Sequence, residues 1–202
     1  MAADLESRRE AVRAEIEAGF AATPPPDPRQ LIATYDDEGI VDYFAGRDRW
    51  DHTPWDLRWL EASLSYFTPS AFRYYVPAYM LATLDDRDTM DSVPDRLWRT
   101  FCDWSGSSDL FRMTLAELFT EPERAAIAAF IRYESDVRVE TEVVRQPESL
   151  RWSEILELER ETRAILRNLG CLQSPENLLC SEIRRDLFAR RGVEFGEEPP
   201  LG

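Results

Sequence analysis

The chain has 202 residues, 44% of them hydrophobic and 31% charged, which makes it too apolar for a disordered chain and too mixed for a fibrous one. A chain of this length buries roughly 70% of its extended surface on folding, so it needs neither disulfides nor a metal to be stable. Its 24 basic and 39 acidic residues give a formal net charge of -15, which argues against binding to nucleic-acid phosphates or to anionic lipid. We therefore expect a globular protein that binds neither nucleic acid nor a membrane.

Cysteine and histidine are too few for most metal or nucleophile sites. Cys102, Cys171 and Cys180 are odd in number and lack CxxC spacing, so we expect no disulfide framework and no zinc site, as fits a reducing cytoplasm. The sequence has one histidine, His52. In an enzyme it could pair with Cys102 as a catalytic dyad, although a single histidine is more typically a packing or surface residue. Glycine-rich phosphate loops and the esterase Gly-x-Ser-x-Gly motif are absent from the sequence. We expect no cofactor and no metal, and the balance is against an enzyme.

Neither a leader peptide nor a membrane span is expected. The first residues are charged from Asp4 onward and lack the apolar run of a secretory signal, so we expect a cytoplasmic protein. Residues 62–84 carry a single charge, Arg73, and are long enough to span a bilayer. A central arginine costs about 2.5 to 3.5 kcal/mol on insertion scales, and several serines lie in the first half of the segment, so we interpret it as a buried core element.

Signals for helix starts recur along the chain, in which Ser or Thr precedes Pro or lies three residues before an acidic residue. The five pairs are Thr53 with Asp56, Thr68 with Pro69, Ser92 with Asp95, Thr120 with Glu123, and Ser174 with Pro175. Each side-chain oxygen can accept a hydrogen bond from an amide of the first turn. The pattern predicts a mainly α fold with an irregular multi-helix core.

The first predicted element is an amphipathic helix over residues 4–20, in which Val12, Ile16 and Phe20 form one apolar stripe. Four prolines between residues 24 and 28 end this helix and favour an extended connection. The helix is therefore expected to pack on the core through one face.

Three further helices are predicted before residue 85. A short one covers residues 38–45 with Gly46 as its left-handed cap, and longer ones cover residues 54–66 and 69–84. Pro77 lacks an amide hydrogen and is expected to kink or break the last of these helices. Because this helix is apolar nearly all round, it should lie at the centre of the fold.

The rest of the chain is predicted to be helical with one ambiguous segment. A helix near residues 93–104 precedes another that starts at Thr120. Residues 136–144 alternate valine with charged residues, which is the period of a strand, although a continued helix fits as well. The choice between strand and helix stays open at this point.

The C-terminal part is predicted to be a helical hairpin. Apolar residues recur at three-and-four spacing over residues 155–169 and four apart over residues 179–187, and a glycine follows each run. We therefore divide the chain into a helical core domain, residues 1–145, and an α-hairpin extension with a tail, residues 146–202. The hairpin either packs on the core or forms a homodimer through residues 150–190.

Aromatic residues are concentrated in one part of the chain. They are Trp50, Trp55, Trp59, Tyr66, Phe67, Phe72, Tyr74, Tyr75 and Tyr79. A large aromatic core is the favoured interpretation, because exposed rings beside polar donors would be needed for stacking on a ligand. The ligand-binding alternative uses Arg73 to hold an anion, together with Tyr74, Trp55 and Trp59.

Acidic residues form two local groups that are candidates for partner binding. They are Asp36, Asp37, Glu38 and Asp42 in one group, and Asp85, Asp86, Asp88 and Asp91 in the other. The second group lacks the glycine and terminal glutamate of a calcium loop, so we do not assign a metal. Their field would steer a basic protein toward the chain, although capping of helices explains such residues without any function.

Two motifs resemble a bacterial family of small acidic proteins known as a domain of unknown function. Residues 64–81, LSYFTPSAFRYYVPAYML, are similar to the family's LSFLTPEAFRYYLPAYLL, with Ser70 in place of a glutamate. Residues 119–130 resemble its FTPEQRxAIxxF, with Pro122 as a departure. The resemblance covers about residues 14–134 and implies a bacterial helical domain, without catalytic residues to carry over.

These observations lead to three hypotheses for function. The first is a non-enzymatic binding protein of the immunity or inhibitor type, which masks a basic partner such as a toxin domain. The second is a small ligand-binding domain or enzyme that uses the aromatic segment 50–79 around Arg73. The third is a scaffold that assembles through the C-terminal hairpin.

Overall fold

The computed structural model describes residues 2–33, 35–36, 38–102, 115–145 and 152–170. Within these ranges the chain forms ten helices and no β-strand, which confirms the predicted mainly α fold. The helices are α1 (Ala2–Phe20), α2 (Ile40–Phe44), α3 (Pro54–Trp59), α4 (Ser63–Tyr66), α5 (Pro69–Asp85), α6 (Arg87–Met90), α7 (Val93–Cys102), α8 (Leu115–Leu118), α9 (Glu121–Arg145) and α10 (Trp152–Asn168).

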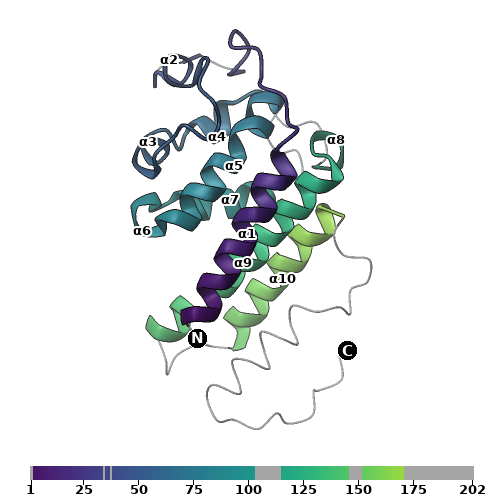
Figure 1. Ribbon diagram of the computed structural model, residues 1–202. Coiled ribbons are helices and arrows are strands. Elements are labelled where there is room, and N and C mark those ends of the chain that lie inside the picture. The colour runs from purple at the N-terminus through teal and green to yellow at the C-terminus, as the bar shows by residue number, and fades with distance from the viewer. Residues whose placement is uncertain (1, 34, 37, 103–114, 146–151, 171–202) are drawn as a thin grey trace.

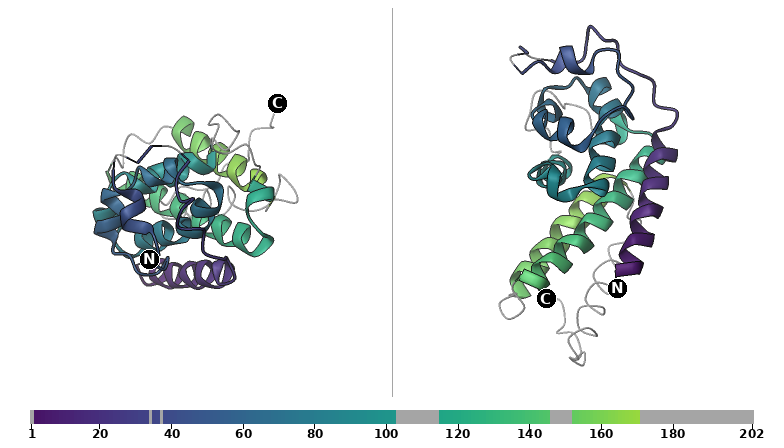
Figure 2. Two further views of the ribbon diagram at one scale, coloured as in Figure 1. Left: turned by 90° about the horizontal axis from the view of Figure 1, so that it is seen from above. Right: turned by 60° about the vertical axis from the view of Figure 1, so that its left-hand side comes forward.

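The three long helices α1, α9 and α10 lie side by side, and the shorter helices gather around α5 next to them (Figure 1). α9 packs against both α1 and α10, while α5 contacts α1, α3, α6, α7 and α8. A second view shows that the long helices extend past the shorter ones at the end of the molecule where the N-terminus lies (Figure 2). α5 through its contact with α1, and α7 through its contact with α10, therefore join the two groups of helices.

Four of the five predicted helix starts coincide with observed ones. α3, α5, α7 and α9 begin directly after Thr53, Thr68, Ser92 and Thr120. The Thr53 hydroxyl accepts a hydrogen bond from the Asp56 amide at 3.2 Å, as a residue that caps a helix should. Gly46, the predicted left-handed cap after α2, has a φ of 78°. The fifth start, at Ser174, lies outside the described residues.

The predicted helix over residues 54–66 is wrong in one respect, because the structure divides it into α3 and α4. Between them the amides of Glu61 and Ser63 bond to carbonyls only three residues back, those of Arg58 and Leu60, which is a tighter turn than an α-helix makes. The tight turn brings the buried Ser63 hydroxyl within 2.6 Å of the Tyr79 hydroxyl on α5. A tertiary contact with α5 therefore accompanies the interruption of local helix geometry.

α5 runs through Pro77 without a break, so the predicted kink does not end the helix. Nearly every side chain from Ala71 to Leu84 is buried, as the apolar sequence predicted. Packing on several sides offsets the cost of about 3 kcal/mol for a proline in a helix interior. In the described part of the chain, no helix combines the length and the apolar character needed to cross a membrane.

The ambiguous residues 136–144 are helical, because α9 continues without interruption to Arg145. α9 packs along α1, and their approach is close at Gly19, where an added Cβ would lie 2.8 Å from the Pro122 carbonyl oxygen. An already formed helix that is packed on a neighbour extends more easily than an isolated edge strand forms. The strand alternative is therefore excluded.

The first helix of the predicted C-terminal hairpin, α10, packs against α9 and α7. Its Ile165, Leu166 and Leu169 are buried in the same hydrophobic cluster as the core helices. Of the two possibilities considered for the hairpin, packing on the core therefore describes α10. The second predicted helix and the tail lie outside the described residues, so assembly through residues 150–190 stays a prediction.

Candidate functional site

Two large apolar side chains of α3 face solvent instead of the core. Trp55 is 56% exposed and Trp59 is 65% exposed, while Leu57 between them is buried and anchors the helix. The two indole rings meet edge to face, with centroids 5.8 Å apart. The Arg58 guanidinium lies over both rings, 5.7 Å from the centroid of Trp55 and 5.9 Å from that of Trp59. Exposed tryptophans next to an arginine are typical of surfaces that bind another protein.

Three members of the second acidic group, Asp86, Asp88 and Asp91, lie on α6 or next to it, and α6 packs against the helix that carries this tryptophan pair. Asp91 accepts a hydrogen bond from Arg58 at 2.8 Å, and Asp86 and Asp88 are exposed on the same short helix and its cap. Hydrogen bonds from the hydroxyl and the amide of Thr89 lower the pKa of Asp86, so its carboxylate is ionised at neutral pH. Three carboxylates thus accompany the Arg58 guanidinium, while Arg87 of α6 is paired with the buried Glu134, so the surface carries a net negative charge.

We call this surface the α3–α6 face. It comprises Trp55, Arg58, Trp59, Asp86, Asp88 and Asp91. Sequence analysis assigned its tryptophans to a ligand and its carboxylates to a partner, and it missed Arg58. The structure places the two kinds of residue together because α3 and α6 pack against each other.

The remaining acidic candidates lie elsewhere. Asp85 pairs with Arg13 of α1. Asp36 caps α2, and its carboxylate accepts the amides of Ile40 at 2.9 Å and Val41 at 2.8 Å. Although burial raises the pKa of Asp36, these backbone hydrogen bonds outweigh it and lower the pKa. α2 and α6 lie apart in Figure 1, so the two acidic groups do not form one patch in the described structure.

Glu38 and Asp42 are exposed around α2. Asp37 lies outside the described residues. Next to this first group, Tyr35 is 82% exposed, whereas Phe44 of α2 is buried in the core.

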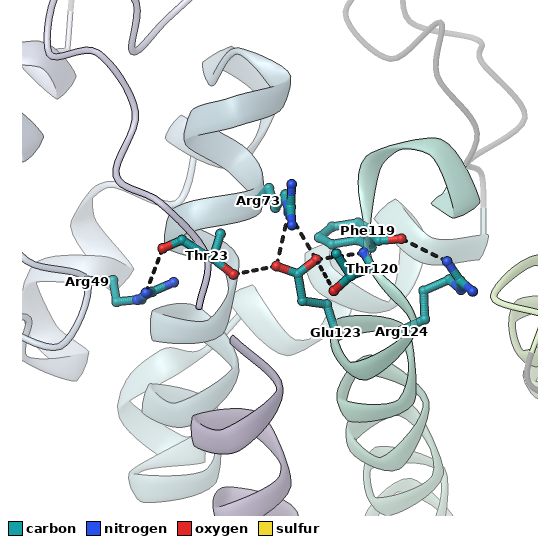
Figure 3. Close-up of polar contacts among 7 residues, drawn as sticks. All are labelled: Thr23, Arg49, Arg73, Phe119, Thr120, Glu123 and Arg124. Atoms are coloured by element: carbon teal, nitrogen blue, oxygen red, sulfur yellow. Dashed lines mark hydrogen bonds and ion pairs between the residues drawn. The ribbon is translucent and has the colours of Figure 1, made fainter. Parts of the chain in front are cut away.

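Arg73, the predicted anion-binding residue, is bound to a carboxylate of the chain itself (Figure 3). Its Nε donates to both oxygens of Glu123, at 3.0 Å and 2.9 Å. Glu123 is 1% exposed and also accepts hydrogen bonds from the Thr120 amide at 2.7 Å, the Thr120 hydroxyl at 2.9 Å and the Thr23 hydroxyl. Burial raises the pKa of Glu123, but these hydrogen bonds outweigh burial and lower it. The carboxylate is therefore held in its charged form.

This cluster joins three parts of the fold. Glu123 starts α9, Arg73 comes from α5, and Thr23 follows α1. On the other side, the Thr23 carbonyl accepts a hydrogen bond from Nη2 of Arg49 at 2.9 Å, as Figure 3 shows. The sequence marked Glu123 as a helix-start residue, but its long-range partners had no sequence signal. The arrangement joins these helices through Nε of Arg73, and the anion-binding role predicted for Arg73 stays a prediction.

Tyr74 differs from the other predicted ligand residues because it belongs to the core. Its hydroxyl donates to Asp48 at 3.3 Å, and burial raises its pKa. Phe67, Phe72 and Tyr79 are buried as well, as the aromatic-core interpretation predicted. Among the described residues, no group of three His, Cys, Asp or Glu side chains is placed to hold a metal ion.

The fold and the α3–α6 face define a mainly α protein with an exposed, acidic, tryptophan-bearing surface. Residues 29–151 match the family described as a family of unknown function (DUF6714), and the chain belongs to that family. The match confirms the predicted membership of a family of unknown function, and it spans α2 to α9 with the α3–α6 face and Glu123. No curated protein and no solved structure matches the chain.

Proposed function

We propose that this chain is a bacterial, cytoplasmic binding protein, without catalytic activity, that masks a basic surface of another protein in the manner of an immunity or inhibitor protein. The observation that carries the proposal is the exposed pair Trp55 and Trp59 beside the carboxylates of α6. Each tryptophan buries about 150 to 250 Å² when covered, which is enough for two rings to dominate a small interface.

The charges around the pair favour a basic partner. The formal net charge of -15 attracts a cationic protein over a distance, and Asp86, Asp88 and Asp91 supply acceptors for lysine or arginine side chains at contact. The tryptophan faces offer a second means of holding a cation, by cation–π attraction. In the free protein the Arg58 guanidinium lies over the two rings and pairs with Asp91. A cation of the partner therefore competes with Arg58 for the rings and for Asp91.

A capture experiment with matched variants tests the proposal. The chain is immobilised and challenged with native bacterial lysate at low and high salt, alongside the double variant Trp55→Ala/Trp59→Ala. Tyr35→Ala is the control, because Tyr35 is 82% exposed and lies outside the α3–α6 face. We expect basic proteins to be retained at low salt by the wild type and by Tyr35→Ala, and to be lost at high salt and from the double variant.

A retained protein is then purified and its affinity measured by calorimetry with the same three baits. A loss of at least about tenfold in the double variant supports the proposal, because truncating a central tryptophan costs roughly 2 kcal/mol or more. If such a partner is a toxin encoded next to this chain, coexpression should suppress its toxicity. Equal affinity of all three baits, or retention that ignores salt, contradicts the proposed surface.

A further inference from the structure

A cleft separate from the α3–α6 face lies between α1, α5 and the loop that connects α2 to α3. Its volume is about 480 Å³, within the range of roughly 300 to 1,000 Å³ that small-molecule sites occupy. Arg13 from α1 and Asp85 from α5 form an ion pair at the cleft, Glu17 of α1 adds a second carboxylate, and Leu81 of α5 adds an apolar wall. The loop contributes Arg49, Trp50 and His52.

Arg49 is the first residue of the cleft that points to a ligand. Its side chain is only 6% exposed, and although Nη2 donates to the Thr23 carbonyl, both Nε and Nη1 are buried without an acceptor. The rings of Tyr74 and Trp50 lie 4.3 Å and 5.1 Å from its guanidinium carbon and cover it from solvent. Burial lowers the pKa of Arg49, yet an arginine keeps its charge at neutral pH.

Buried charged donors without acceptors are rare in folded proteins, because each has lost its water without a replacement. Arg73, by comparison, has such an acceptor: its Nε donates to both carboxylate oxygens of Glu123 at 3.0 Å or less. Asp48 and Glu123 lie near enough to favour the charged form of Arg49, but neither accepts a hydrogen bond from its Nε or Nη1. The missing group is therefore an acceptor, and a negatively charged one would match the guanidinium best.

His52 is the second residue of the cleft with an unused polar atom. Its ring packs among Tyr43, Phe44 and Tyr75, as the packing interpretation predicted, and Nδ1 lies 3.1 Å from the Tyr43 hydroxyl. Nε2 is buried without a partner. Burial lowers the pKa of His52 to about 4, so the ring is neutral at physiological pH and adds a hydrogen-bonding atom without adding charge.

We propose that this cleft binds a small organic oxyanion, such as a phosphate or carboxylate group on a planar body. The oxyanion accepts hydrogen bonds from Nε or Nη1 of Arg49, and a second polar atom of the ligand meets Nε2 of His52. The body of the ligand lies against the partly exposed ring of Trp50 and the apolar wall at Leu81. Because these nitrogens are buried in the free protein, the proposal requires the side chains that cover them to move when the ligand binds.

Calorimetric titration with phenyl phosphate, benzoate, inorganic phosphate and the neutral benzyl alcohol tests the site in the full chain. We expect saturable binding of phenyl phosphate or benzoate, and none of benzyl alcohol. Because His52 is the one histidine of the sequence, its ring signals in a nuclear magnetic resonance spectrum report occupancy of the cleft directly. These signals should shift along with the calorimetric saturation.

Variants separate the site from general attraction of anions to arginine. Arg49→Gln should weaken binding by about tenfold or more, since hydrogen bonds to a charged group are lost. Trp50→Ala should weaken phenyl phosphate and benzoate while it leaves inorganic phosphate little changed. Arg29→Gln, at an exposed arginine that does not line the cleft, is the matched control and should bind as the wild type does.

Three results would overturn the proposal. They are no saturable binding of any of the three oxyanions to the wild type, binding without a shift of the His52 signals, and equal losses in Arg49→Gln and Arg29→Gln. If Arg49→Gln fails to fold, the wild-type titration and Trp50→Ala still decide the matter. The Trp55→Ala/Trp59→Ala variant should keep its oxyanion binding, so failure of the cleft and failure of the protein-binding face are distinguishable.

Discussion

Replacing Glu123 by glutamine tests whether the cluster at the start of α9 stabilises the fold. Its buried carboxylate is bound by Arg73, Thr120 and Thr23, from three different parts of the chain. Glutamine has nearly the same shape but no charge, and its terminal NH2 group cannot accept the hydrogen bond that Nε of Arg73 donates to both carboxylate oxygens. The variant therefore removes the ion pair and sets donor against donor without leaving a cavity.

The expected magnitude follows from the exposure of the two partners. Removing one member of a buried ion pair costs about 3 to 5 kcal/mol when the other remains buried. The Arg73 side chain is 27% exposed, so water can hydrate its guanidinium in the variant and reduce this cost. A hydrogen bond to a charged group contributes about 1.5 to 3 kcal/mol, and we expect Glu123→Gln to lower the free energy of unfolding by about 2 to 4 kcal/mol.

Urea unfolding followed by circular dichroism measures this loss. With a slope of about 2 kcal/mol per molar urea, the midpoint should fall by roughly 1 to 2 M. Glu121→Gln is the matched control, because Glu121 lies in the same first turn of α9 and is exposed. Its midpoint should stay within about 0.3 M of the wild type. Equal midpoints for the two variants would refute the role assigned to the cluster.

Acid provides an independent check of the same reasoning. The pKa of Glu123 in the folded chain is below its usual value of 4.5, so its contribution to stability is present above that value and is lost as the pH falls through the folded pKa. Glutamine does not titrate. The difference in unfolding free energy between the wild type and Glu123→Gln should therefore shrink as the pH is lowered from 4.5.

Three further predictions concern separate parts of the fold. Gly19→Ala should lower the stability by about 1 to 3 kcal/mol, seen as a lower Tm in calorimetry, because its Cβ would lie 2.9 Å from that of Ala126; an unchanged Tm contradicts the close approach of α1 and α9. Burial raises the pKa of Glu134 in spite of its pairing with Arg87, so its charged form is less favourable than that of Glu123. Glu134→Gln should therefore lower the free energy of urea unfolding by less than Glu123→Gln does. His52 should titrate near pH 4 by magnetic resonance and, because this folded pKa is lower than the usual 6.5, should reduce stability progressively as the pH falls from 6.5 to 4; a midpoint near 6.5 would show that the ring is hydrated.

The sequence alone determined the features that depend on neighbouring residues. The hydroxyls of Thr53 and Thr68 accept hydrogen bonds from amides only three residues ahead, so the starts of α3 and α5 depend on neighbouring residues alone. The burial of α5 also followed from its composition, because a helix that is apolar on all sides has no other place than the centre. Membership of a family of unknown function was predicted from residues 64–81 and 119–130, and the match over residues 29–151 confirms that membership.

Only the tertiary structure decided the features that join distant residues. Arg73 and Glu123 are 50 positions apart, and nothing in the sequence around either residue shows that the two side chains form an ion pair. The same holds for Trp55 and Trp59, which look like core residues until α3 is seen with Leu57 turned inward and the carboxylates of α6 alongside. Helix starts are local hydrogen-bonding events, whereas exposure, ion pairing and clefts depend on which helices meet, and that choice belongs to the packing of the whole chain.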